Sequence, residues 1–139
     1  MTESVQENAP FRGLPVLVTG ATGKVGRHLV QALLDEGARV TILTRTPEKA
    51  RTLWPGTPVT GRAGDLGDAA SLAAPWVGVE CIFHLASYAP GSDEADIYEA
   101  PSHWTVSAEG TRNLVAAALT GGIRSLVYLS SIKVMGDAA

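Results

Sequence analysis

The stretch LVTGATGKVGRHL, Leu17–Leu29, joins an apolar run to a helical pattern through three glycines. The run that leads into it, Pro15–Thr19, is rich in β-branched residues without polar alternation, which is typical of a parallel strand covered on both faces. After the glycines, apolar residues recur at helical spacing until Gly37, where a helix would end: Val25, Leu29 and Leu33. The stretch therefore predicts a strand, a glycine-rich turn and a helix over 24–36.

The three glycines have a physical reason in such a turn. The turn faces the positive end of the helix, where free backbone N–H groups can hold a phosphate. Gly20 would allow the tight turn, Gly23 would let the main chain approach a pyrophosphate, and Gly26 would let the helix pack closely on the strand. The alternative is a loop that merely contains glycines. The predicted dinucleotide contacts in this stretch are Gly20, Thr22, Gly23, Lys24, Val25 and Gly26.

Strand-like and helical patterns alternate along the rest of the chain. Further strands are expected at Arg39–Leu43, around Val59, at Glu80–Ala86 and over 125–131. Between them, a short helix is expected with Thr46 as N-cap, followed by one or two helical turns over 68–74 and a long helix over 102–122. This alternation predicts an α/β fold with a parallel sheet and right-handed crossovers.

Two of these helices carry more detailed signals. Pro47 is expected at the first helical position after Thr46, because its fixed φ suits that place. The long helix should bury one face, which carries Val106, Gly110, Leu114 and Ala117. Gly121 and Gly122 would end this helix.

Length and composition limit the class of protein. The 139 residues fit one domain over 13–139, preceded by a polar, acidic leader over 1–12 that we expect to be flexible. The net charge is −3 and the basic residues are scattered, which argues against a nucleic acid or a membrane surface as partner. No apolar run approaches the ~20 residues of a membrane helix, and the leader has no apolar core of a signal peptide, so we expect a soluble cytoplasmic protein.

The single cysteine and the histidines give no sign of a disulfide or a metal site. Cys81 lies in an apolar run, VECIFHLA, and is expected to be a small buried hydrophobe in a reducing compartment. No Cys, His or Asp cluster has the spacing of metal ligands, so no metal is predicted.

The chain resembles a known family at five places. VTGATGKVG, residues 18–26, fits the T-G-x-x-G-x-x-G pattern of the short-chain dehydrogenase/reductase superfamily. Four further stretches resemble its extended branch of NAD-dependent epimerase/dehydratase type: GDLGD at 64–68, HLAS at 84–87, EGTRNLVAAA at 109–118 and VYLSSIKVMG at 127–136. The resemblance implies a Rossmann-type, doubly wound sheet of about five strands in the order 3-2-1-4-5. It also implies that the chain corresponds to the N-terminal half, truncated before the catalytic helix.

The resemblance also implies further coenzyme contacts. Asp65, with Leu66, would contact the adenine ring, where its carboxylate can accept a hydrogen bond from the exocyclic amine. The alternative for Asp65 is a loop cap, because aspartate is common in turns. Leu85, Ala86 and Ser87 would line the ribose and nicotinamide side, which is compatible with Leu85 and Ala86 being ordinary strand-end core.

The end of the second strand indicates which nicotinamide coenzyme is bound. NAD-binding folds usually place an acid there to bind the ribose 2′-OH, but here Thr44 and Arg45 follow. A guanidinium can bind a 2′-phosphate in a charge-assisted pair, so we expect NADP(H) to be favoured over NAD(H). Lys49, one helical turn on, could join this pocket, and a solvated surface cation is the alternative for both side chains.

The catalytic residues of the family are only partly represented. Ser131 stands at the family's serine position, which implies a hydrogen bond to the substrate oxygen. The family's Tyr-x-x-x-Lys pair is absent, because the residues four places after the tyrosines are Ser92, Ser102 and Ile132. Ser107 replaces the asparagine that the family usually has before x-x-G-T.

These observations support one hypothesis and leave others open. The chain would be the NAD(P)-binding portion of an oxidoreductase or epimerase that transfers hydride between nicotinamide and a carbonyl or alcohol of an unidentified small molecule. A non-catalytic NAD(P)-binding redox sensor and an inactive truncated fragment are the alternatives. The loop from Tyr88 to Pro101 could form the substrate mouth or be a solvated acidic loop, and a homodimer is left open.

Overall fold

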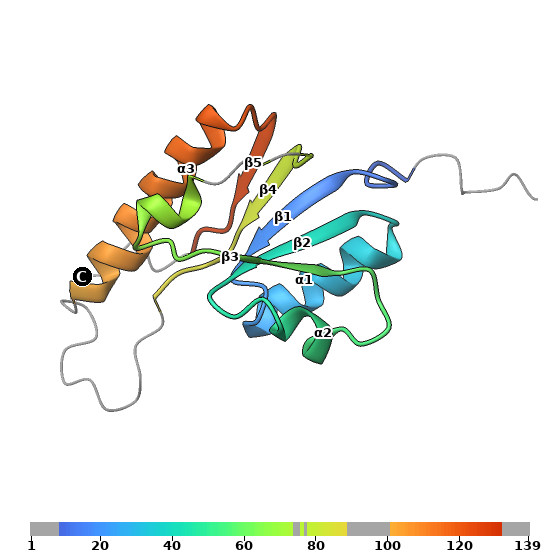
Figure 1. Ribbon diagram of the computed structural model, residues 1–139. Coiled ribbons are helices and arrows are strands. Elements are labelled where there is room, and N and C mark those ends of the chain that lie inside the picture. Colours follow the sequence, from blue (N-terminus) through green and yellow to red (C-terminus); the bar gives the residue numbers. More distant parts are fainter. Residues whose placement is uncertain (1–8, 74–75, 77, 89–100, 132–139) are drawn as a thin grey trace, which may run out of the picture.

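The computed structural model of the chain describes residues 9–73, 76, 78–88 and 101–131. In this part of the chain five parallel strands form one sheet, in the order β3-β2-β1-β4-β5 (Figure 1). The strands are β1 (Pro15–Thr19), β2 (Arg39–Thr44), β3 (Thr60–Ala63), β4 (Cys81–His84) and β5 (Ser125–Tyr128). The predicted parallel sheet and its strand order are confirmed.

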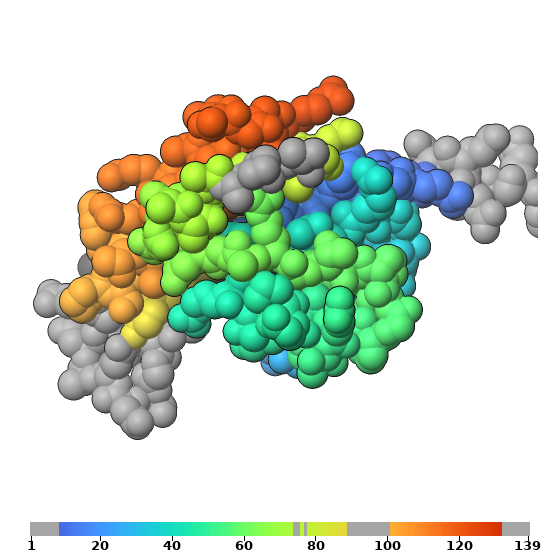
Figure 2. Space-filling view, viewed as in Figure 1, coloured from blue at the N-terminus to red at the C-terminus, as the bar shows by residue number. Residues whose placement is uncertain are grey.

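Helices cover both faces of the sheet. They are α1 (Lys24–Asp35), α2 (Lys49–Leu53), the 3₁₀-helix η1 (Ala69–Leu72), the π-helix η2 (His103–Glu109) and α3 (Gly110–Thr120). Figure 1 shows α1 and α2 on one side of the sheet and α3 on the other. In the space-filling view, η1 in light green lies between the green β3 segment and the orange α3 (Figure 2). The domain is therefore doubly wound.

Alternation along β1 explains why the core has two halves. Val16 and Val18 pack with the residues of α1 and α2, whereas Leu17 packs with Leu114 of α3 on the opposite face. All three β1 side chains are almost completely buried, as expected for a central parallel strand. Cys81 is buried in the first of these two cores, as its apolar surroundings predicted.

The register brings the carboxyl ends of the strands to one edge. Thr19 at the end of β1 pairs with Leu43 on one side and with His84 on the other. The chain runs from β1 outward to β3 and then returns to β4, so the strand order reverses between β1 and β4. This reversal is the place where open α/β sheets bind their ligands.

The buried face of α1 differs from the predicted one. Of the residues at helical spacing, Leu33 is buried and Leu29 packs against the first core, but Val25 is 57% exposed, and the buried positions of the helix are Gly26, Val30 and Leu33. The reason is the close approach of the helix to the turn: a Cβ at Gly26 would overlap the carbonyl oxygen of Gly20. A bare glycine, rather than the valine beside it, therefore sets the rotation of the helix.

The short helix after β2 also begins later than predicted. α2 begins at Lys49 with Glu48 as N-cap, not at Pro47 after Thr46. The Thr46 N–H is bonded to Thr44 Oγ1 at 3.1 Å, and the Pro47 carbonyl lies so close to Gly61 that a Cβ on that glycine would overlap it. These contacts hold residues 44–47 in a turn, and the helix begins only after it.

Two other elements differ in detail. The long helix starts as a π-helix, and its most buried positions are Gly110, Leu114 and Ala118, while Ala117 is only half-buried. Phe11, within the leader expected over 1–12, packs against the first core and lies 6.2 Å from the ring of Phe83. None of the helices in the described part of the chain is long and apolar enough to cross a membrane.

Candidate functional site

Two of the three glycines in the turn after β1 are required by the fold itself. Gly20 has φ +69°, and a Cβ there would lie 2.6 Å from the backbone nitrogen of Ala86. Gly26 has no room for a side chain against the Gly20 carbonyl. Gly23 is different, because its φ is −75° and a Cβ would meet only the Gly20 oxygen, at 3.4 Å. The fold therefore does not explain why position 23 lacks a side chain.

The amino end of α1 is open to an external anion. Gly23 is its N-cap, no side chain caps it, and its first turn holds no acidic residue. The first N–H groups of a helix have no partner within the helix, and they stabilise negative charge. Arg27 Nε donates to the Thr22 carbonyl at 3.0 Å, which keeps a guanidinium beside the turn. Lys24 and Arg27 give this end positive charge, which favours an anionic ligand.

The structure brings the segment after β4 against this turn. The N–H of Leu85 donates to the Thr19 carbonyl at 3.2 Å, which continues the contact between β1 and β4 past the end of the strand. Leu85 and Ala86 are half-buried and touch the Gly20 position, while Ser87 is exposed. The turn and the predicted nicotinamide-side residues therefore share one edge of the sheet.

On the other side of β1, the predicted adenosine-side residues lie at neighbouring strand ends. The Thr44 carbonyl at the end of β2 accepts from the N–H of Gly64, which follows β3. This bond ties the start of the GDLGD stretch to the strand end that precedes Arg45, an exposed side chain. β2 ends at Thr44, so a threonine rather than an acid stands at the end of this strand. The Oγ1 of Thr44 accepts a hydrogen bond from the Thr46 N–H.

The two residues predicted at the adenine ring have different surroundings. Asp65 Oδ1 accepts from the Gly67 N–H at 2.9 Å, so this exposed carboxylate does cap its own loop. Leu66 is buried under α3, and its carbonyl accepts from Asn113 Nδ2 at 2.8 Å. A loop-capping carboxylate keeps its second oxygen available, so the adenine contact of Asp65 stays a prediction.

Other predicted features lie at the limits of the described residues. Ser131 is exposed, three residues beyond β5, and its role stays a prediction. Most of the loop between Tyr88 and Pro101 lies outside the described residues, as does the end of the VYLSSIKVMG stretch, residues 132–136. Among the described residues, no three His, Cys, Asp or Glu side chains gather closely enough to hold a metal ion.

A buried polar cluster lies beneath the turn, and sequence reasoning did not find the two partners of its histidine. His84 is completely buried, and its two ring nitrogens lie 2.6 Å from Thr19 Oγ1 and 2.8 Å from Thr111 Oγ1. Burial lowers the pKa of His84 to about 4, so the ring is neutral at pH 7. The only sequence signal was a histidine at the end of an apolar strand, because its partners are distant in the chain.

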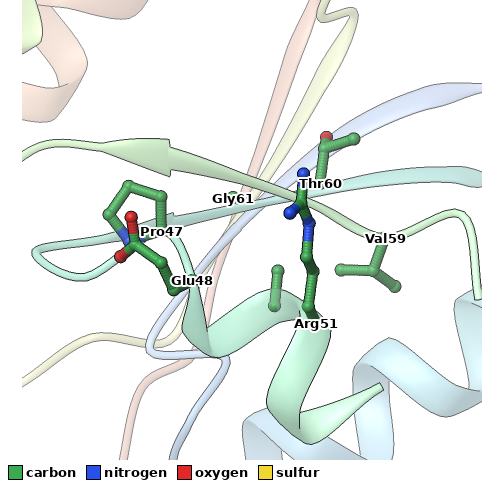
Figure 3. A pocket seen from close by; sticks show the side chains of 7 residues that line it. Pro47, Glu48, Arg51, Val59, Thr60 and Gly61 are labelled. Carbon is green, nitrogen blue, oxygen red and sulfur yellow. The ribbon is translucent and has the colours of Figure 1, made fainter. Parts of the chain in front are cut away.

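Two cavities lie away from the predicted contacts. One, of about 310 Å³, lies between α2 and β3, where the Arg51 side chain extends toward Thr60 (Figure 3). The other, of about 320 Å³, lies between η1 and α3 and includes Leu72 and Trp76 in its wall. None of the predicted coenzyme contacts lines either cavity.

Comparison with known proteins agrees with the geometry of the turn and the sheet. A family model described as "NAD dependent epimerase/dehydratase family" matches residues 16–139. The chain belongs to this family. The resemblance noted from its five sequence stretches is thereby confirmed.

Individual relatives cover the chain almost completely but are much longer. A 3 beta-hydroxysteroid dehydrogenase/Delta 5→4-isomerase of Mycobacterium tuberculosis is 38% identical over 124 residues, which is 86% of this chain and 32% of the relative. Sterol demethylase protein B of Methylococcus capsulatus is 34% identical over 88% of this chain and 36% of the relative. The chain thus spans about a third of the length of the curated relatives it matches.

A solved structure gives the same result for the fold. A short-chain dehydrogenase/reductase superfamily protein of Agrobacterium tumefaciens, with bound NAD, is 31% identical and superposes with a TM-score of 0.68. The match covers 87% of this chain and 34% of that protein.

Proposed function

We propose that the chain is the coenzyme-binding portion of an NAD(P)-dependent oxidoreductase or epimerase. In the whole protein, hydride would pass between the nicotinamide and a carbonyl or alcohol carbon of a small molecule. The observation that carries the proposal is the combination of an uncapped α1 with a Gly23 that the fold does not need to be bare. A pyrophosphate against the N–H groups of this turn explains both features.

The residues of this chain would act by binding and orienting. The N–H groups at the start of α1 hold the pyrophosphate, and the Gly20–Gly23 backbone lets it come close. Leu85, Ala86 and Ser87 form the wall beside the nicotinamide half. The coenzyme itself supplies hydride transfer. Ser131 donates a hydrogen bond to the substrate oxygen and stabilises charge that develops there.

The adenosine end supports a preference for NADP(H). Arg45 follows β2 at the strand end that contacts the ribose 2′ position in these folds. Thr44 stands where an acid, if present, would repel a 2′-phosphate. A guanidinium–phosphate pair is charge-assisted and selective for the phosphorylated coenzyme. The contacts of Asp65 with the adenine would be shared by both coenzymes.

Titration of the chain with NADPH and NADH tests this proposal. Calorimetry is expected to show binding of both, with NADPH binding more tightly. Arg45→Ala should weaken NADPH binding roughly tenfold and thereby remove the preference, because a charge-assisted bond is lost. Arg39→Ala is the matched control, because Arg39 is an exposed arginine at the opposite end of the same strand. Absence of binding at millimolar coenzyme would contradict the function, and an unchanged preference would contradict the assignment of Arg45.

A further inference from the structure

A chain of hydrogen bonds begins and ends on the short segment that follows β4. The Ala86 N–H donates to Thr19 Oγ1 at 3.2 Å, and the Tyr88 N–H donates to Ser107 Oγ at 3.0 Å. Thr19 ends β1, and Ser107 lies in η2 on the other side of the segment. Two N–H groups of this segment are thus fixed from two different elements.

His84 and Thr111 connect these two anchors through the protein interior. Thr111 Oγ1 donates to the Ser107 carbonyl at 2.6 Å, which uses its only hydroxyl proton. It must therefore accept from His84 Nε2–H at 2.8 Å. A neutral imidazole protonated at Nε2 accepts at Nδ1, so the Thr19 hydroxyl donates to it at 2.6 Å. Only this direction of the bonds satisfies every donor.

The anchored segment lies where the second half of a dinucleotide would be. The end of β2 serves the adenosine ribose in this fold, and the ligand crosses the sheet edge at the reversal between β1 and β4. The far half of the ligand therefore reaches the end of β4, where Leu85–Ser87 leave the strand. The start of α1 is held on the pyrophosphate turn by the close contact of Gly26 with the Gly20 carbonyl, and this contact is not part of the chain of bonds.

We infer that Thr111 and Ser107 are positioning residues for the nicotinamide half of the coenzyme. Acting through His84 and directly on Tyr88, they hold residues 85–88 in the conformation that receives the nicotinamide before it binds. The inference rests on the proposed dinucleotide function and adds which half of the ligand these residues serve. A protein that must order this segment on binding would lose affinity in proportion to the fraction that is not ordered.

The test compares two ligands on the same protein. The full coenzyme is whichever of NADPH and NADH binds more tightly, and the fragment is 2′-phospho-ADP-ribose or ADP-ribose, which lacks the nicotinamide. The wild-type chain is expected to bind the full coenzyme about tenfold more tightly than the fragment. The reason is that the nicotinamide ring adds about one net contact with a segment that is already ordered.

Thr111→Val should remove most of that tenfold advantage and leave fragment affinity within about twofold, because it leaves a buried His84 N–H without an acceptor. Thr111→Ser keeps the hydroxyl and should restore the advantage. Thr120→Val is the matched control: Thr120 makes the same bond to a carbonyl four residues earlier in α3, but it has an exposed side chain and no bond to His84. Ser107→Ala removes the acceptor of the Tyr88 N–H and so tests the other anchor. It replaces Thr111→Val in the comparison if that variant does not fold.

The possible outcomes separate this inference from the proposed function. Loss of the full-coenzyme advantage with unchanged fragment affinity supports the inference. Equal weakening of both ligands, an unchanged ratio, or a wild-type chain that binds both ligands equally would overturn it while leaving dinucleotide binding in place. A wild-type chain that binds neither ligand would overturn the proposed function together with the inference.

Discussion

Two strand-to-helix turns in this domain differ in how they satisfy their backbone N–H groups. In the turn from β3 to η1, Asp65, Asp68 and Ser71 side chains accept hydrogen bonds from the N–H groups of the same turn. In the turn from β1 to α1, no side chain caps the helix, and its first residues are basic or apolar. The turn from β3 to η1, the closed turn, is capped by its own side chains. The turn from β1 to α1, the open turn, has no side-chain acceptor, and a pyrophosphate would supply one.

The glycines of the open turn sharpen this difference, and Gly26→Ala should have the largest effect. A methyl group there would overlap the Gly20 carbonyl and force α1 away from β1, at a cost of about 3 kcal/mol in the free energy of unfolding. Urea unfolding followed by circular dichroism measures this. A Gly26→Ala chain as stable as wild type would show that the helix does not pack on the turn as described.

His84, which is buried beneath the open turn, makes the free energy of unfolding depend on pH. Its pKa is about 4 when folded and near 6.5 when unfolded, so the unfolded chain binds more protons between these values. The histidine's contribution is complete above pH 6.5, and roughly 3 kcal/mol is lost as the pH falls to 4. Chemical denaturation at pH 7, 5.5 and 4.5 should show this slope, and His84→Gln should reduce it.

His28 provides the control for the pH experiment, because it lies exposed on α1. His28→Gln should keep the slope of the wild-type chain. A slope that disappears with His28→Gln and persists with His84→Gln would contradict the assignment of the buried cluster.

Asp68→Ala should have a smaller effect, and only on the closed turn. Asp68 Oδ1 accepts from the Ala70 N–H at 3.1 Å and caps η1. Loss of this cap should lower the free energy of unfolding by about 1 kcal/mol. Coenzyme affinity should not change, because this cap is internal to η1. A loss in the free energy of coenzyme binding larger than the loss in the free energy of unfolding would contradict this account, because it would show that the closed turn also serves the coenzyme.

Sequence reasoning predicted the parallel sheet and the turn because both depend on local signals. The glycine spacing, the β-branched run before it and the alternation of strands and helices were sufficient for a parallel α/β fold, whereas the order of the strands in the sheet was implied by the family resemblance. The same local reasoning misplaced Val25 on the buried face, because the rotation of α1 is set by the contact of Gly26 with Gly20. It also placed the start of α2 too early, because the turn at Thr46 is held by Thr44.

The candidate site was predictable only in part, for a related reason. Gly20 and Arg45 follow strand ends that the alternation of elements brings to one edge. The link from Thr19 through His84 to Thr111 depends on side chains 65 and 27 residues apart in sequence, and no local spacing indicates it. Such links become visible only when the register of β1 and β4 and the position of α3 are known.

The most direct test of the central claim is Gly23→Ser. The backbone of residue 23 already has the extended conformation of an N-cap, and a serine hydroxyl there would accept from an N–H of the first turn. The account predicts that the ligand-free chain becomes as stable as wild type or more stable, by a few tenths of a kcal/mol, while coenzyme affinity falls at least about tenfold. A Gly23→Ser chain that binds NADPH and NADH as tightly as wild type would contradict it.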